Sequence, residues 1–301
     1  MSIATIKNVV LTNLVLLAAV ACGPGRQASW EKESASKQQV TPEASAPASQ
    51  DNDAEAAWAS RSTKAELEKA LVIWESELAK APENADVLTK LARGYYFLAD
   101  AHLRFENNAD VLLATYEKGI QAGERAMMAV SPEFSKQVKA GTKVEEAVKV
   151  IPQSGQSAIY WYATNLGRFA VQKGFTTLLF YKDRIYAVMQ QVLALDETFF
   201  HGAPHRYFGA FYAKAPSFAG GDLANSEEHF KKALEIAPLY LGTKTLYAEF
   251  YATKADKRDL FESLLKEVVA GDADAIAGIA PEQKVEQQKA EQLLEDAEEL
   301  F

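Results

Sequence analysis

Apolar residues recur at intervals of three and four along the chain from Ser62 onward, which is the period of an α-helix. No stretch alternates over enough residues, with turn signals on both sides, to predict a strand. The pattern therefore predicts an all-α body of about ten to twelve helices and no sheet. Glycine and proline separate the helical runs at Pro82, Pro132, Pro152, Gly174, Pro204, Pro216, Gly220, Gly221, Pro238, Gly271 and Pro281.

One of these runs, Gly220 to Tyr240, has the residue spacing of a tetratricopeptide helix. Phe230 is followed three residues later by the small Ala233 and five residues after that by Pro238. In the second helix of such a repeat, the small residue lets the first helix approach closely, and the large residue fills the groove against the next repeat. The proline ends the helix because it has no N–H to continue the hydrogen-bond ladder.

Trp74, Glu77 and Pro82 have the same spacing, with Glu77 in place of the small residue, and they predict where the next repeat begins. If Pro82 is position 32 of one repeat, the next repeat starts at Ala85, and residues of the expected size then fall at the positions of the W-x2-L-G-x2-Y pattern. The matching residues are Leu88, Leu91, Ala92 and Tyr95, and in later repeats Phe208, Gly209 and Tyr212, and Tyr247, Ala248 and Tyr251. Because two-helix units cannot bury their faces alone, residues 62–301 are predicted to stack into one tetratricopeptide-like α-solenoid.

The first residues of the chain indicate an export signal and not part of the fold. Lys7 precedes the apolar run Val9 to Val20, and small residues lead to Cys22. The run is shorter than the about 20 apolar residues of a transmembrane helix. Its ending resembles a bacterial lipoprotein signal, which makes residues 1–21 a signal peptide and Cys22 the lipidated first residue of the mature chain; an ordinary secretory signal with an incidental cysteine is the alternative. No Asp follows Cys22, so we expect a periplasmic protein anchored by lipid in the outer membrane.

Residues 22–61 contain the lipidated cysteine and a segment rich in Ser, Ala, Gln, Pro and Glu. Trp30 and Trp58 are its only large apolar residues, so we expect a disordered tether, with Trp58 close to the start of the folded body. Its ~38 residues would hold the body roughly 35 Å from the membrane on average.

The charge and the cysteine count exclude several classes of partner and cofactor. With 41 acidic and 32 basic residues, the net charge of −9 repels a phosphate backbone, so nucleic acid is not an expected partner. One cysteine cannot form an intrachain disulfide, and one cysteine with four scattered histidines cannot build a zinc cage. We expect no cofactor.

Three motifs are more specific than a generic repeat. They are the YWY-x2-N-x-G run at Tyr160 to Gly167, the HGAPHRYFG run at His201 to Gly209, and the P-x3-GGD loop at Pro216 to Asp222. Together with the tail Lys289 to Phe301, they resemble the T component of TRAP-type (tripartite ATP-independent periplasmic) transporters, from roughly Leu67 to Phe301. The resemblance implies an all-α periplasmic scaffold with an internal groove or cavity, and partnership with the solute-binding subunit that delivers substrate to the permease.

Aromatic and polar residues of these motifs are candidates for the lining of a small-molecule site. Apolar walls with a few convergent polar groups are typical of such pockets, and the fork of Arg206 suits a carboxylate ligand. Packing between repeats is the alternative explanation for each of these residues. The candidate ligand-binding residues are Tyr95, Trp161, Tyr162, Asn165, His205, Arg206 and Tyr212.

Metal and phosphate sites are not predicted. His201 and His205 have the spacing of a helical metal pair, but Gly202 to Pro204 between them break a helix and supply no base, so a capping or groove-lining role is expected. The glycine pair before Asp222 lacks the Lys-Ser/Thr of a phosphate loop, so Asp222 is predicted to be a helix N-cap.

The sequence therefore favours a non-catalytic scaffold that docks the solute-binding subunit of a TRAP-type transporter, and that could hold or pass a small organic ligand. The alternative is a generic tetratricopeptide lipoprotein that scaffolds envelope assembly without a ligand. An enzyme is not expected, because no trio of nucleophile, base and orienting group is present. Self-association is a further hypothesis, since the helix expected from Pro281 to Phe301 could cap the array or dock on a neighbouring subunit.

Overall fold

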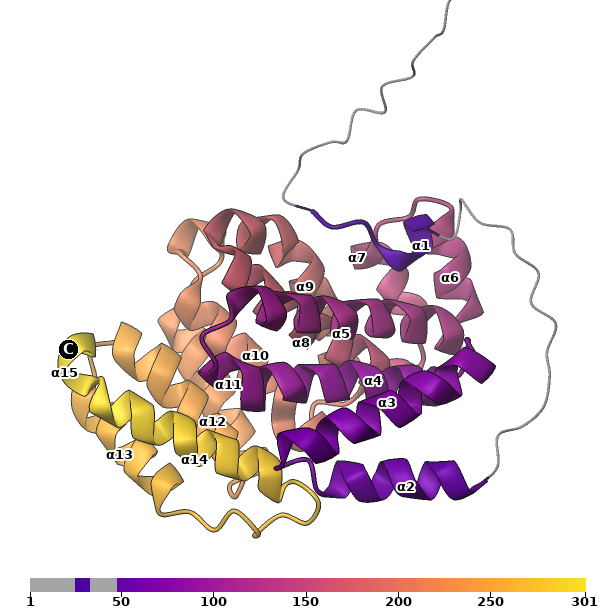
Figure 1. Ribbon diagram of the computed structural model, residues 1–301. Helices are drawn as coiled ribbons and strands as arrows, with labels where there is room; N and C mark the ends of the chain where they lie inside the picture. The colour runs from indigo at the N-terminus through magenta and orange to yellow at the C-terminus, as the bar shows by residue number, and fades with distance from the viewer. Residues whose placement is uncertain (1–24, 33–47) are drawn as a thin grey trace, which may run out of the picture.

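The computed structural model describes residues 25–32 and 48–301, and this part of the chain is helical and contains no strand (Figure 1). Its fifteen α-helices exceed the ten to twelve expected, in part because α1, α7 and α15 are single turns of four residues. The helices are α1 (Ser29–Lys32), α2 (Ala48–Ala59), α3 (Lys64–Lys80), α4 (Ala85–Phe97), α5 (Ala109–Val130), α6 (Pro132–Lys139), α7 (Val144–Ala147), α8 (Gln156–Lys173), α9 (Phe175–Leu195), α10 (Phe199–Lys214), α11 (Leu223–Ile236), α12 (Leu241–Leu246), α13 (Arg258–Val269), α14 (Ala280–Glu295) and α15 (Ala297–Leu300).

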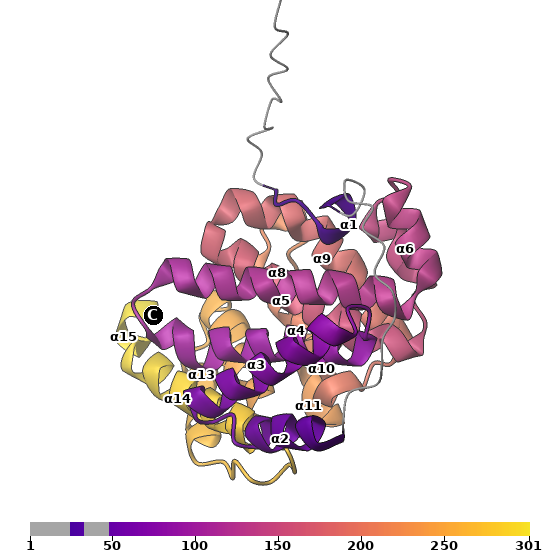
Figure 2. The ribbon, with the colours of Figure 1, turned by 45° about the vertical axis from the view of Figure 1, so that its right-hand side comes forward.

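The long helices pack against their neighbours in sequence, as stacked two-helix units do. Contacts join α3 to α4, α4 to α5, α5 to α8, α8 to α9, α10 to α11, and α13 to α14. The short helices α6 and α7 lie with α1 and α9 at one end of the molecule, and α14 lies toward the opposite end (Figures 1 and 2). This arrangement confirms the predicted all-α, solenoid-like fold.

Phe230 occupies the place that the repeat spacing predicts for it. Its side chain is fully buried, and its ring stacks on that of Tyr247 in the following unit, with centroids 5.0 Å apart. On its other side, a Cβ added to Gly209 of α10 would come within 2.8 Å of the Phe230 ring. The ring therefore fills the space between the first helix of its own unit and the next unit.

The loop before α11 is a turn with a helix cap, as predicted. The Asp222 carboxylate accepts hydrogen bonds from the backbone N–H groups of Ala224 and Asn225, at 2.9 and 3.1 Å. These bonds satisfy donors that have no partner inside the helix. Gly220 supplies the left-handed residue of the turn, with φ 99°.

The segment expected to be a tether differs from that expectation in its described parts. Trp30 is buried and packs edge-on against Phe134 of α6, with ring centroids 6.1 Å apart. Residues 48–59 form α2, which packs on α3. The ring centroids of Trp58 on α2 and Trp74 on α3 are 5.6 Å apart. The composition of a segment shows only how much apolar surface the segment itself contains. Here the segment is ordered because Trp30 and Trp58 pack against apolar residues of the body, which the composition does not include. Cys22 and the predicted signal peptide lie outside the described residues.

Among residues 25–32 and 48–301, none of the helices combines the length and the apolar composition that a membrane span requires. The C-terminal helix predicted from Pro281 lies against its own chain, because α14 packs on α12 and α13. This placement fits the capping role; self-association stays a prediction.

Candidate functional site

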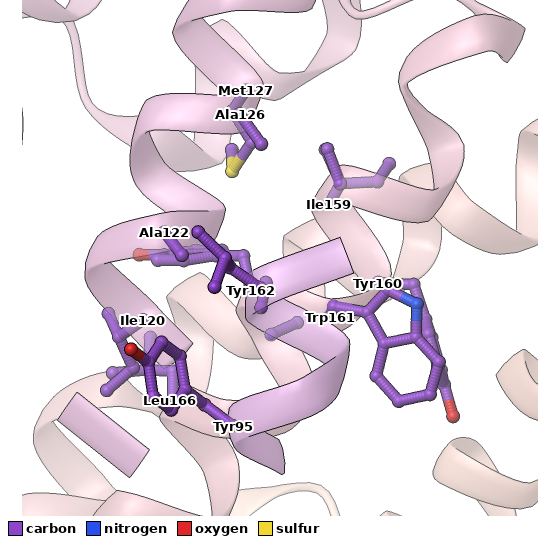
Figure 3. Packing of buried hydrophobic residues seen from close by; sticks show 14 of the residues in the cluster. Tyr95, Ile120, Ala122, Ala126, Met127, Ile159, Tyr160, Trp161, Tyr162 and Leu166 are labelled. Atoms are coloured by element: carbon purple, nitrogen blue, oxygen red, sulfur yellow. The ribbon is translucent and has the colours of Figure 1, made fainter. Parts of the chain in front are cut away.

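The aromatic cluster predicted on α8 is divided between two sides of that helix. Trp161 packs against Tyr96 of α4 and Phe200 of α10, with ring centroids 5.5 and 5.2 Å apart. Tyr162 points the other way, toward Ala122 of α5 (Figure 3). Both side chains are buried. The two residues therefore join α8 to helices on either side and do not face one common space.

Asn165 links three helices. Its side-chain N–H groups donate to the carbonyl oxygens of Ala92 on α4 and Trp161 on α8, at 2.9 and 2.8 Å. Gly119 of α5 leaves room for the amide, because a Cβ there would collide with it. The amide is fully buried, so its position supports the packing of α4, α5 and α8.

Arg206 supports a strained turn at the start of α10. Phe200, His201 and Gly202 have left-handed backbone conformations, with φ of 42°, 60° and 75°. Two of these are not glycine, which makes the turn costly unless its surroundings hold it. The Arg206 guanidinium donates to the carbonyls of Phe200 (2.8 Å) and His201, and it lies 4.1 Å from the ring centroid of Tyr240. Arg206 is buried, so a carboxylate ligand would have to enter the packed interior to reach its remaining N–H groups.

His205 and Tyr212 belong to a second polar group between α10 and α11. His205 Nδ1 lies 2.9 Å from Nδ1 of His229, and its Nε2 lies 3.1 Å from the Glu197 carboxylate. The Tyr212 ring stacks on His229, with centroids 5.6 Å apart. Burial and the neighbouring His205 lower the pKa of His229 to about 4, so this ring is neutral at pH 7.

His201 lies apart from this group, stacked on Tyr240 with ring centroids 5.1 Å apart. The helix break predicted at Gly202 to Pro204 is present at Gly202, the last residue of the left-handed turn, whereas Pro204 lies inside α10. Because His201 belongs to that turn, the two histidines do not share a regular helix. In residues 25–32 and 48–301, no three His, Cys, Asp or Glu side chains are grouped so that they could hold a metal ion.

Two ion clusters that hold α14 against the inner helices were not predicted. Arg61 and Arg93 both donate to Glu282, and Arg93 does so at 2.8 Å. Lys289 donates to the buried Asp100 at 2.6 Å. The partners in these pairs are about 190 residues or more apart in sequence, so no local pattern could have indicated them.

An open groove of about 480 Å³ lies where α3, α4 and α5 meet. Both apolar and polar side chains line it, and none of them is Ser, Cys or His. The lining residues are Glu75, Leu78, Ala79, Pro82, Leu91, Tyr95, Lys118, Gln121, Ala122 and Arg125. Of the seven candidate ligand-binding residues, Tyr95 lines this groove; the other six lie in the packing contacts described above.

Two polar side chains of the groove, Tyr95 and Lys118, lie around the carboxylate of Glu75. The Tyr95 hydroxyl donates to Glu75, and the Lys118 ammonium lies 3.9 Å from the same carboxylate and 5.3 Å from the Tyr95 ring centroid. Burial and Glu75 raise the pKa of Tyr95, so its hydroxyl stays protonated. Arg125 donates to the Pro82 carbonyl at 2.6 Å. The groove can bind a side chain or a small molecule non-covalently through an apolar floor and charged edges.

Comparison with known proteins gives one family. The family model described as TRAP transporter T-component matches residues 63–301 of the chain. A search of the curated proteins found no match to the chain.

Proposed function

The chain belongs to the TRAP transporter T-component family, and we propose that it is a non-catalytic scaffold that docks the solute-binding subunit of such a transporter. Membership makes it a protein associated with a TRAP transporter and suggests an envelope location. Docking, the choice of subunit and any handling of ligand are the parts that we propose. The observation that carries them is the groove between α3, α4 and α5, because it is open to solvent and combines apolar and charged groups.

The groove has the composition of a small docking site. Its floor includes Leu78, Leu91 and Ala122, and its edge carries Lys118, whose side chain is 61 % exposed. An apolar centre with charges at the rim is typical of protein interfaces, where rim charges set specificity and association rate. A loop of the solute-binding subunit with an acidic side chain would fit between Lys118 and the apolar floor.

We propose that any organic acid held by the protein also binds in this groove, next to Tyr95 and Lys118. The ammonium of Lys118 is largely exposed and lies 3.9 Å from the Glu75 carboxylate, at the limit of an ion pair. By contrast, the Arg206 guanidinium predicted to bind an acid already donates to two backbone carbonyls. The geometry therefore favours Lys118 over Arg206 as the cation for an acid.

The anchor that we propose for the body is a lipid on Cys22, in the outer membrane. The support for it is the sequence of the export signal and the envelope location suggested by the family. A protein held in this way would meet the solute-binding subunit at the membrane surface.

The Lys118→Glu variant is expected to weaken docking about tenfold, which is about 1.4 kcal/mol. The substitution reverses the charge at the rim and places a second carboxylate beside Glu75. The measurement is the dissociation constant of the purified chain and the solute-binding subunit, by calorimetry at fixed ionic strength.

Lys231→Glu is the matched control, because the side chain of Lys231 is also 61 % exposed and lies on α11, away from the groove. It should leave the dissociation constant unchanged. Equal effects of the two substitutions would show that net charge matters and the groove does not. If the wild-type chain bound no solute-binding subunit at all, the alternative of an envelope-assembly scaffold without a ligand would be favoured.

A further inference from the structure

The start of the described chain is fixed to the body by buried polar contacts. The Arg26 side chain donates to Glu124, whose side chain is fully buried, and the same carboxylate accepts from the N–H and the hydroxyl of Ser29 at 2.8 and 2.7 Å. The Arg26 N–H donates to the hydroxyl of Tyr181 on α9, at 2.8 Å. Residue 25 is therefore held beside α9.

A group of exposed apolar side chains surrounds the turn between α8 and α9. The exposed fractions are 38 % for Val171, 61 % for Phe175, 45 % for Leu179 and 54 % for Phe180. Phe175 and Leu179 are four residues apart on α9 and so share a face. Single exposed apolar residues are ordinary on a protein surface, but four within ten consecutive residues, at the end of one helix and the start of the next, indicate a binding surface. We call these four residues the α8–α9 patch.

The patch touches the segment that leads to the predicted lipid anchor. A Cβ built at Gly25 would lie 3.0 Å from the ring of Phe180, so the backbone at residue 25 lies against that ring. Cys22 is three residues earlier, and three residues span at most ~11 Å. A lipid on Cys22 would therefore hold Phe180 close to the membrane surface, whatever path the intervening residues take.

We propose that the α8–α9 patch inserts into the headgroup region of the membrane beside the lipid anchor. This inference rests on the proposed lipidation of Cys22. Lys173 lies beside the patch in sequence, and its ammonium lies 5.9 Å from the ring centroid of Phe169 on α8. Lys182 also lies beside the patch, but it is paired with Asp183 at 2.6 Å. Aromatic and aliphatic side chains with a lysine at their edge suit a surface of apolar chains and anionic headgroups.

The size of the patch favours a membrane over a second copy of the chain. A stable protein interface buries about 800 Å² on each partner. Even at about 200 Å² for a fully exposed aromatic side chain, these four partly exposed residues offer less than roughly half of that area. Membrane contact needs no such area, because the acyl chains on Cys22 would supply most of the binding and the patch would set the orientation. The end with α1 and α9 would then face the membrane, and α14 would face away (Figures 1 and 2).

The single cysteine of the chain makes a direct test possible. If lipid occupies the thiol of Cys22, a cysteine introduced elsewhere is the only free thiol. The Leu179→Cys variant of the lipidated full chain would be labelled with a polarity-sensitive fluorophore and placed in vesicles of phosphatidylethanolamine and phosphatidylglycerol that carry a nitroxide quencher near the headgroups. The control is Leu239→Cys, since Leu239 is 56 % exposed and its carbonyl bonds to Gln283 of α14.

The label at residue 179 is expected to be quenched at least about threefold more than the label at residue 239. Adding Phe175→Glu and Phe180→Glu should reduce the quenching at residue 179 to the control level, because a carboxylate resists transfer out of water and is repelled by anionic lipid.

Equal quenching at the two sites in protein that sediments with the vesicles would overturn the proposal while the anchor stands. Self-association would replace membrane insertion as the explanation if the label at residue 179 were quenched by a labelled second copy of the chain but not by the quencher lipid. Protein that stays in the supernatant would overturn both the anchor and the inserted patch. The effect of Lys118→Glu on docking, measured in solution, is independent of all three results.

Discussion

Replacing Asp100 with asparagine is expected to lower the free energy of unfolding by about 3 kcal/mol. Asp100 is 6 % exposed and is the shared partner of Lys289 at 2.6 Å, Arg168 at 3.4 Å and Arg104 at 3.5 Å. Asparagine keeps the shape of the side chain but leaves the buried ammonium without this counter-charge. The loss lies at the low end of the range for broken buried pairs, because Lys289 keeps Glu286 at 2.8 Å. The midpoint and slope of urea unfolding measure it.

The Asp100→Asn variant also tests how the free energy of unfolding depends on pH, and the charges around Asp100 determine the sign of that dependence. Burial alone would raise the pKa of Asp100, but Lys289, Arg168 and Arg104 outweigh it and hold the pKa well below its ordinary value. A carboxylate with a lowered pKa in the folded state stabilises that state above the unfolded pKa of about 4, and this stabilisation is lost as the pH falls toward the folded pKa. The difference between wild type and Asp100→Asn should therefore be constant near pH 7 and shrink below about pH 4.

Asp183→Asn provides the control for Asp100→Asn. Asp183 also contacts a lysine, Lys182 at 2.6 Å, but its side chain is 80 % exposed. Exposed ion pairs contribute little, so this change should stay within about 0.5 kcal/mol of wild type. If both asparagine variants had equally small effects, the Asp100 cluster would not hold α14 in place.

The Phe230→Ala variant is expected to lose about 3–5 kcal/mol of unfolding free energy, because it opens a cavity between two repeat units. The ring of Phe230 is fully buried between Gly209 of α10 and Tyr247, so little can collapse into the space that it leaves. The unfolding midpoint by circular dichroism is the measurement. Phe218→Ala is the control, because Phe218 is 83 % exposed and should change stability by less than about 0.5 kcal/mol.

The fold was largely predictable because its signals are local. The period of apolar residues predicts helices, and the spacing of Phe230, Ala233 and Pro238 places a large buried ring where the structure has one. Asp222 could be predicted as a cap because the N–H groups that it binds are two and three residues away. In each case the interacting groups lie on the same helix or on helices that are close together in the sequence.

The parts that could not be predicted depend on contacts between distant segments. Trp30 stands in a stretch that looks disordered by composition, and only Phe134, which comes about a hundred residues later, explains its burial. Lys289 and Asp100 look like ordinary surface charges until the fold brings them together. The candidate site shows the same limit: Arg206 has the chemistry to bind an acid, but its burial against the strained turn at Phe200 and His201, whose carbonyls accept two of its N–H groups, has no signature in the sequence.

The most direct test of the central claim is an affinity purification from cross-linked membranes, with a tag placed after Phe301 and mass spectrometry of the proteins that are recovered. We predict that a periplasmic solute-binding protein of a TRAP transporter is recovered with the chain, and that less of it is recovered with Lys118→Glu than with Lys231→Glu. Recovery of envelope-assembly proteins, with no solute-binding protein at any salt concentration, would contradict the proposed docking function.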